Sequence, residues 1–148
     1  MSTTWRPPQI VRPLAIGVIR RGEGLLVAAV PDGAGIITGW RPLGGSIEFG
    51  ERTADTLRRE LIEELGLAIT QPKLLTVIEN LYEHQGVIGH DIVLVFETAF
   101  EEAAAYSREE FRFSDGGVEC RAQWIDAGQF RRGAEQLFPA GLLERTSL

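Results

Sequence analysis

Short runs of apolar residues alternate with glycine-rich and charged segments along this chain of 148 residues. The runs LAIGVI (14–19) and LLVAAV (25–30) are separated by RRGEG and predict a hairpin of two buried strands. Two longer segments, KLLTVIENLYEH (73–84) and GHDIVLVFETAF (89–100), are strand candidates joined by the glycine-flanked QGVIG. VECRAQWIDA (118–127) alternates like a final strand.

A helix is predicted over residues 52–65, between the two groups of strands. Apolar residues recur there at steps of three and four positions and form one stripe, made of Ala54, Leu57, Leu61 and Leu65. Gly66 then provides a C-terminal stop. This segment is the longest helix that the pattern predicts.

The remaining segments are predicted from their turn residues. Residues 1–13 carry three prolines and form an irregular lead-in, and residues 31–39 are rich in turn residues. WRPLGG (40–45) is a brief extended piece ending in glycines, and the polar stretch 101–117 is a loop. AGQFRRGAEQLF and PAGLLERTSL form short closing helices, the second beginning at Pro139.

The order of strands, helix, strands and helix predicts an α/β (α+β) fold with a mixed sheet and helices on its faces. The chain contains no internal repeat and no linker-like segment, so we expect residues 1–148 to form a single domain.

The composition of the chain argues against several classes of partner and of structural site. The formal net charge of −6 argues against long nucleic acids, because binders of these polyanions are usually basic. A single cysteine excludes an internal disulfide and a cysteine-based zinc cluster, and it fits a cytoplasmic protein. The N-terminus lacks the layout of a signal peptide, and no apolar run reaches the roughly 18 residues of a membrane span.

Three glutamates fall within a single turn of the predicted helix: Glu60, Glu63 and Glu64. Repulsion between carboxylates one turn apart costs only about 0.2–0.5 kcal/mol on a solvated helix. A charged, solvent-exposed helix face is therefore one interpretation. The other is a cation site, because Mg²⁺ is held by one or two carboxylates together with substrate phosphates.

The segment before the helix favours the cation site. Gly44, Gly45 and Gly50 allow tight turns and close approach of the backbone to a ligand. Glu48 and Glu51 add two further carboxylates in the same corner. A solvated helix face would not require the glycines.

These residues resemble the complete signature of the Nudix hydrolases. Gly45 is followed after five residues by Glu51, and after seven more by RELIEELGL (59–67). Gly44 and Glu48 also fit the common GGxxExGE form. The resemblance implies a Nudix-type α/β/α sandwich with a central mixed sheet. It also implies hydrolysis of a nucleoside diphosphate linked to another group, by attack of water on phosphorus, with Mg²⁺ or Mn²⁺ as cofactor.

The resemblance also implies roles for residues of the motif. Glu60, Glu63 and Glu64 are the metal-ligand candidates, with the Gly45 carbonyl as an additional ligand. Arg59 would orient the carboxylates by pairing with a glutamate at the start of the helix, Glu51. The general base is Glu60, Glu63 or one of four carboxylates outside the motif, namely Glu97, Glu109, Glu110 and Glu119.

Candidates for contact with the substrate lie around the motif. Arg41 is close in sequence to Gly44 and could meet a phosphate, Trp40 and Tyr82 could stack on a base, and Glu48 belongs to the loop itself. The substrate stays open among nucleoside triphosphates, nucleotide sugars, ADP-ribose and diadenosine polyphosphates. Many relatives form homodimers, so a homodimer is compatible with the resemblance. The alternative function is a non-catalytic nucleotide sensor, although such domains usually lose part of the motif.

Overall fold

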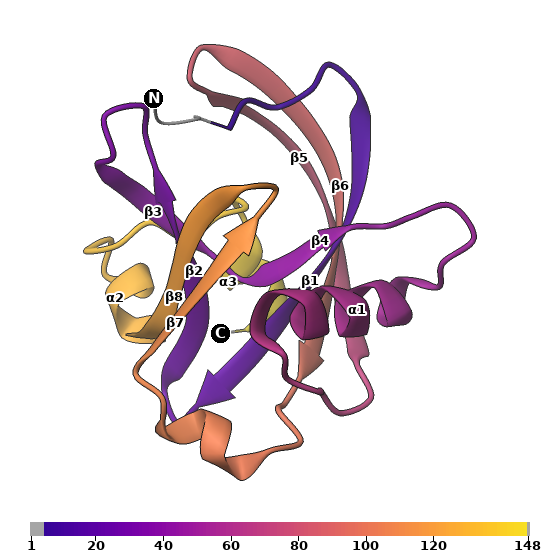
Figure 1. Cartoon of the computed structure of the whole chain (residues 1–148). Coiled ribbons are helices and arrows are strands. Elements are labelled where there is room, and N and C mark those ends of the chain that lie inside the picture. The colour runs from indigo at the N-terminus through magenta and orange to yellow at the C-terminus, as the bar shows by residue number, and fades with distance from the viewer. Residues whose placement is uncertain (1–4, 148) are drawn as a thin grey trace.

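An eight-stranded mixed sheet forms the centre of the protein (Figure 1). In the computed structural model, which describes residues 5–147, the strands are β1 (Val11–Arg21), β2 (Gly24–Pro31), β3 (Ile37–Arg41), β4 (Leu43–Ser46), β5 (Lys73–His84), β6 (Val87–Thr98), β7 (Glu110–Asp115) and β8 (Val118–Asp126). Their order is β5-β6-β1-β2-β8-β7, with β3 paired to β2 and β4 paired to β1. β1 and β6 are parallel, and the other paired strands are antiparallel.

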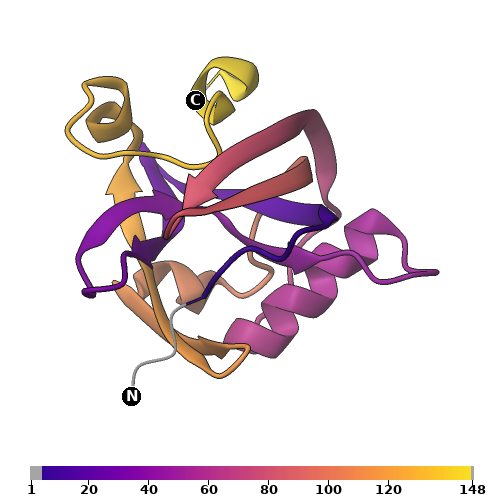
Figure 2. The same cartoon turned by 90° about the horizontal axis from the view of Figure 1, so that it is seen from above.

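Helices cover both sides of this sheet, as the view from above shows (Figure 2). α1 (Thr53–Leu65) lies on one side, and α2 (Ala127–Arg131) and α3 (Leu142–Thr146) lie on the other. A short 3-10 helix, η1 (Ala103–Ser107), precedes β7. The predicted mixed sheet between helices is confirmed. Of the helices within residues 5–147, none has the length and hydrophobicity that a bilayer crossing needs.

Two hydrophobic clusters fill the spaces between the sheet and its helices, and β1 contributes to both. Ala15 and Ile19 pack in the cluster that contains α1, whereas Ile16 and Val18 pack in the cluster that contains α2 and α3. Successive side chains of a strand point to opposite faces, so a strand covered on both sides is apolar throughout. This explains why LAIGVI is a continuous apolar run.

The predicted helix is confirmed as α1. Its residues Leu57 and Leu61 are completely buried, and a side chain at Gly17 of β1 would come within 3.1 Å of Leu57. Gly66 ends the helix with φ 69°, and its N–H donates to the carbonyl of Ile62. The close packing of α1 on β1 fixes the direction in which the glutamates of α1 project.

Several predicted boundaries were wrong in the first half of the chain. The irregular lead-in was expected to reach residue 13, but β1 begins at Val11; residues 1–4 lie outside the described part. The carbonyl of Pro13 accepts a hydrogen bond from the N–H of Ile47, so Pro13 still provides an acceptor within the strand. The β5–β6 connection is only the tight turn at Gln85 and Gly86, because pairing continues to His84 and Val87.

The second half of the chain differs from the prediction in three places. The first is the helix expected over AGQFRRGAEQLF, which ends already at Arg131. Residues 101–117 were expected to be a loop, yet they contain η1 and β7. Phe111 and Phe113 alternate with charged residues and are buried, and β7 pairs with β8 along its length. The last helix begins at Leu142 and not at Pro139, because Gly141 adopts a left-handed conformation (φ 88°) directly before it.

Candidate active site

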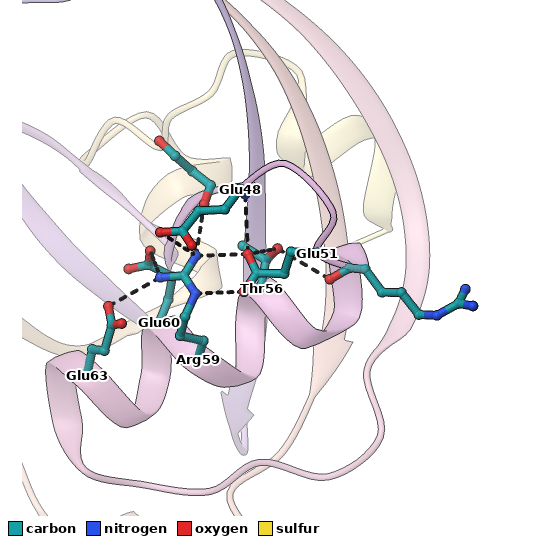
Figure 3. A network of polar contacts seen from close by, with 8 residues as sticks. Glu48, Glu51, Thr56, Arg59, Glu60 and Glu63 are labelled. Atoms are coloured by element: carbon teal, nitrogen blue, oxygen red, sulfur yellow. Dashed lines mark hydrogen bonds and ion pairs between the residues drawn. The ribbon is translucent and has the colours of Figure 1, made fainter.

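Arg59 is the centre of a polar network at the N-terminal half of α1 (Figure 3). Its Nε and Nη2 donate to the two carboxylate oxygens of Glu51 at 2.7 and 2.9 Å. Its Nη1 donates to Glu60 at 2.9 Å and to Glu63 at 3.3 Å, and Nη2 also donates to the carbonyl of Ser46 at 3.1 Å. A planar guanidinium can hold several carboxylates in fixed directions. The expected pairing of Arg59 with Glu51 is therefore present.

Glu51 ties the loop to the helix. Its Oε1 also accepts the hydroxyl of Thr56 at 2.7 Å and the backbone N–H of Glu48 at 3.3 Å. The hydrogen bonds from Arg59, and then that from Thr56, lower the pKa of Glu51 to about 2. The loop 46–51 is thus fastened to α1 by a carboxylate that stays ionised at neutral pH.

Glu60 lies against the backbone of the glycine-rich strand β4. A Cβ added to Gly45 would come within 2.3 Å of the Glu60 carboxylate carbon, so a side chain at this position would displace that carboxylate. Burial raises the pKa of Glu60, and the hydrogen bond from Arg59 opposes this rise. The carboxylate of Glu60 and the backbone of Gly45 therefore lie side by side.

Glu64, one turn further along α1, is the most perturbed acid of the site. Both of its carboxylate oxygens are buried and have no hydrogen-bond partner among residues 5–147. Burial raises the pKa of Glu64 to about 8; the charge of Arg41 opposes this, and the charges of Asp115 and Glu60 add to it. Buried carboxylate oxygens without a partner are rare in folded proteins, and a bound cation would satisfy them.

Glu63 differs from the other two acids of the motif. Its side chain is 58% exposed and turns toward Arg59. Within residues 5–147, no three or more histidine, cysteine, aspartate or glutamate side chains are already grouped so that they could hold a metal ion. The carboxylates of Glu60 and Glu64 lie near each other, and Glu60 also lies against the backbone of Gly45. Such a set of oxygens fits the few protein ligands that Mg²⁺ requires.

The β7–β8 hairpin adds a residue that the sequence did not reveal. Asp115, at the end of β7, lies 3.7 Å from Arg41, and its charge contributes to the raised pKa values of Glu60 and Glu64. The sequence SDGG around it signals only a turn. Asp115 joins the site because β7 lies beside α1 in space, which no local pattern could show.

The four carboxylates outside the motif that were candidates for the general base are differently placed. Three of them pair with arginines: Glu97 with Arg20, Glu109 with Arg21, and Glu110 with Arg112. The fourth, Glu119, is exposed on β8, and its charge adds to the raised pKa of the adjacent Cys120, whose main cause is burial. Cys120 is half-buried.

The structure separates the substrate-contact candidates. Arg41 lies beside Glu64, and Glu48 is exposed near Arg59. Trp40 is only 4% exposed and packs in the core, and its indole N–H donates to Glu135 at 2.9 Å. This burial contradicts a stacking role for Trp40. Tyr82 is half-buried on β5, outside the Arg59 network.

Comparisons with known proteins agree with this arrangement. The family model described as NUDIX domain matches residues 11–145. The nucleoside triphosphatase NudI of Escherichia coli is 28% identical over 109 residues, covering 68% of this chain and 77% of that protein.

Solved structures share the fold at low sequence identity. A MutT NUDIX hydrolase from Burkholderia pseudomallei matches with a TM-score of 0.61 and 21% identity, over 81% of this chain and 86% of that one. An ADP-ribose pyrophosphatase from Streptococcus suis matches with a TM-score of 0.59 and 12% identity, over 93% and 88% of the two chains. The activities named for these relatives differ, although the fold is common to them.

Proposed function

Because this chain belongs to the Nudix hydrolase family, and is thus a hydrolase acting on pyrophosphate bonds, we propose that its substrate is a nucleoside triphosphate and its cofactor a divalent cation. The similarity to a nucleoside triphosphatase over 68% of the chain supports this class of substrate. Both the substrate class and the dependence on metal are parts of the proposal. The homodimer suggested by the resemblance stays a prediction.

The observation that carries the proposal is the unpartnered carboxylate of Glu64. Its two buried oxygens, the adjacent Glu60 carboxylate and the backbone carbonyl of Gly45 would hold Mg²⁺ or Mn²⁺. Such a cation, when bound, neutralises phosphate charge and lowers the pKa of water. Oxygen ligands of this kind suit Mg²⁺ and Mn²⁺, and the chemistry of the donors therefore fits the proposed cofactor.

The residues of the chain would divide the remaining work. Arg59 holds the carboxylates of Glu60 and Glu63 through its Nη1 and would keep them in position during reaction. We assign Glu63 as the general base, because its side chain is exposed to water whereas that of Glu60 is packed against Gly45. The oxygen of the attacking water would form a bond to phosphorus while one of its protons passes to Glu63. The bond between phosphorus and the bridging oxygen would break, and the leaving phosphate group would depart with that oxygen.

Arg41 would bind a phosphate of the substrate. Its guanidinium lies beside Glu64 and only 3.7 Å from Asp115. The side chains of Arg41 and Asp115 are partly exposed. A phosphate oxygen can replace Asp115 as the partner of this cation. The position at the border of the acid cluster suits a group that neutralises a polyphosphate.

A substrate panel tests the proposal. The purified protein is incubated with nucleoside triphosphates, ADP-ribose, nucleotide sugars and diadenosine polyphosphates, separately with Mg²⁺, Mn²⁺ or EDTA, and phosphate-containing products are quantified. We expect turnover of nucleoside triphosphates that stops in EDTA. Faster turnover of another class of compound would replace nucleoside triphosphates as the proposed substrate. Full activity in EDTA would contradict the proposed requirement for a divalent cation. Binding of nucleotide without any turnover would favour the sensor function.

A further inference from the structure

A buried ion pair occupies the far end of β1, away from α1. Asp91 of β6 is 4% exposed, and it is the only charged residue among residues 5–147 that is buried to this extent. Arg12 of β1 lies directly opposite, and its Nε and Nη2 donate to the two Asp91 oxygens at 2.9 and 3.0 Å. Taking two charges out of water is costly, and apolar residues of similar size are often as stable. The positions that follow on the same face, Leu14 and Val93, are in fact apolar.

Aromatic side chains surround the guanidinium of Arg12. The hydroxyl of Tyr82 accepts a hydrogen bond from its Nη2 at 3.3 Å. The ring of Trp5, which is 41% exposed, lies 5.0 Å from the guanidinium, and the ring of His84 lies 5.6 Å from that of Trp5. Arg12 is therefore held in one orientation while flat aromatic surfaces beside it stay accessible.

Space for this arrangement is created by a glycine. Tyr82 of β5 pairs with Gly89 of β6, and a Cβ at Gly89 would come within 2.3 Å of the tyrosine ring. The ring thus lies over the bare backbone of β6 and reaches Arg12. We call the group formed by Arg12, Asp91, Tyr82 and Trp5 the Arg12 cluster.

The position of the Arg12 cluster relative to the acids follows from strand register. Ala15 of β1 pairs with Gly45, against which Glu60 lies. Arg12 is three residues before Ala15, roughly 10 Å along the strand. The two groups are thus offset along β1 by about the length that separates the phosphates from the base of a nucleotide.

A nucleotide would have to pass from one face of the sheet to the other. Residues two apart on a strand point to the same face, and Leu14 packs in the cluster of α2 and α3. Arg12 therefore projects on the face opposite α1. Figure 1 shows β4 between α1 and the curved β5–β6 hairpin, and among the described strands β4 pairs only with β1. Its open edge carries Gly44 and Gly45, so no side chain of these two residues blocks a polyphosphate there.

From this placement we infer that Arg12 is a specificity-determining residue that recognises a keto base, guanine or uracil/thymine, of the nucleotide substrate. Within residues 5–147 the Nη1 group of Arg12 makes no hydrogen bond, so it can donate to the carbonyl oxygen of such a base. Guanine and thymine present acceptors where adenine and cytosine present an amino donor, and arginine is the usual partner of guanine. Trp5 stacks on the base, and Asp91 and Tyr82 position the guanidinium.

This inference rests on the proposed function, and the experiments below distinguish a failure of the inference from a failure of the proposed function. Steady-state kinetics are measured with GTP, UTP, ATP and CTP for the wild type, Arg12→Met and Arg12→Lys. The matched control is Arg20→Met, since Arg20 also lies on β1 and pairs with an acid of β6. We expect kcat/KM of the wild type to favour GTP and UTP, and this preference to fall roughly tenfold or more in both Arg12 variants. Arg20→Met should keep the preference.

Binding is measured independently of turnover by calorimetry with GMP and AMP. Tighter binding of GMP to the wild type, lost in Arg12→Lys, supports the inference even if triphosphate hydrolysis is absent. Equal binding of GMP and AMP to the wild type, or binding of neither, overturns it. An unchanged preference in Arg12→Lys with a lower melting temperature also overturns it, because the ion pair would then serve only stability. If Arg12→Met does not fold, Tyr82→Phe replaces it, with a smaller loss of preference expected.

Discussion

At the scale of single residues, Glu64 is the acid of the cluster that is hardest to ionise. Its carboxylate is enclosed by the fold, without a hydrogen-bond donor among the described residues, and like charges on Glu60 and Asp115 are close by. A carboxylate in this environment is costly to ionise unless a cation is present. The ionisation of Glu64 therefore links the stability of the fold to pH and to the binding of a cation.

The pH dependence of stability tests this coupling. Burial raises the pKa of Glu64 to about 8 in the folded protein, so the folded state binds a proton that the unfolded chain releases above its ordinary pKa of 4.5. The stabilising contribution is complete below the unfolded pKa and is lost as the pH rises toward 8. In EDTA, the free energy of unfolding of the wild type should therefore fall between pH 5 and 8 relative to Glu64→Gln, as measured by urea denaturation. Parallel curves for the two proteins would show that Glu64 ionises normally.

Trp40 shows what a sequence cannot reveal about a single residue. Its place beside the glycine loop suggested contact with substrate, but it packs in the core beneath β3. Whether a strand residue points outward depends on the register of pairing, and β3 and β4 are too short for their alternation to define it. The glutamates were predictable because a helix of known period fixes their relative positions.

At the scale of elements, the loop 46–51 and α1 act as one unit. Arg59 connects them through Glu51 and Ser46, and the same guanidinium holds Glu60 and Glu63. The motif spacing predicted this unit, since the helix and its glycine stop are local features. β7 and the contribution of Asp115 were not predictable, because charged residues obscure the alternation around Phe111 and the position beside α1 is a tertiary feature.

Replacement of Arg59 tests whether this unit is needed. Arg59→Ala leaves Glu51 without its main partner and releases Glu60 and Glu63, so we expect a lower free energy of unfolding and a fall in kcat of at least about tenfold. The neighbouring Arg58 makes a more exposed pair with Asp55, and Arg58→Ala should cost less than about 1 kcal/mol. Chemical denaturation and steady-state kinetics measure both effects. Similar results for the two variants would contradict the role of Arg59.

At the scale of the whole molecule, the sheet carries the acid cluster and the proposed base site on its two faces. The acids lie on the α1 side, the Arg12 cluster lies on the other side, and the bare edge of β4 lies between them. Parallel pairing of β1 with β6 cannot be deduced from either strand alone. The sequence therefore identified the chemistry of the motif, whereas the proposed base site required the assembled sheet.

Metal binding should stabilise the whole fold. A cation that binds the folded but not the unfolded protein raises the melting temperature as its concentration increases. We expect Mg²⁺ and Mn²⁺ to raise the melting temperature of the wild type at pH 8, with EDTA reversing the change. Glu64→Gln should respond much less. An equal response of both proteins would place the cation elsewhere on this chain of net charge −6.

The most direct test of the account is the turnover of nucleoside triphosphates by a Glu63→Gln/Glu64→Gln double variant. The exposed Glu101→Gln serves as the matched control, and circular dichroism verifies that all proteins are folded. We predict that kcat falls by more than about a hundredfold in the double variant and stays within twofold of the wild type in the control. Near-normal turnover by the folded double variant would contradict the assignment of the acid cluster as the catalytic and metal-binding centre.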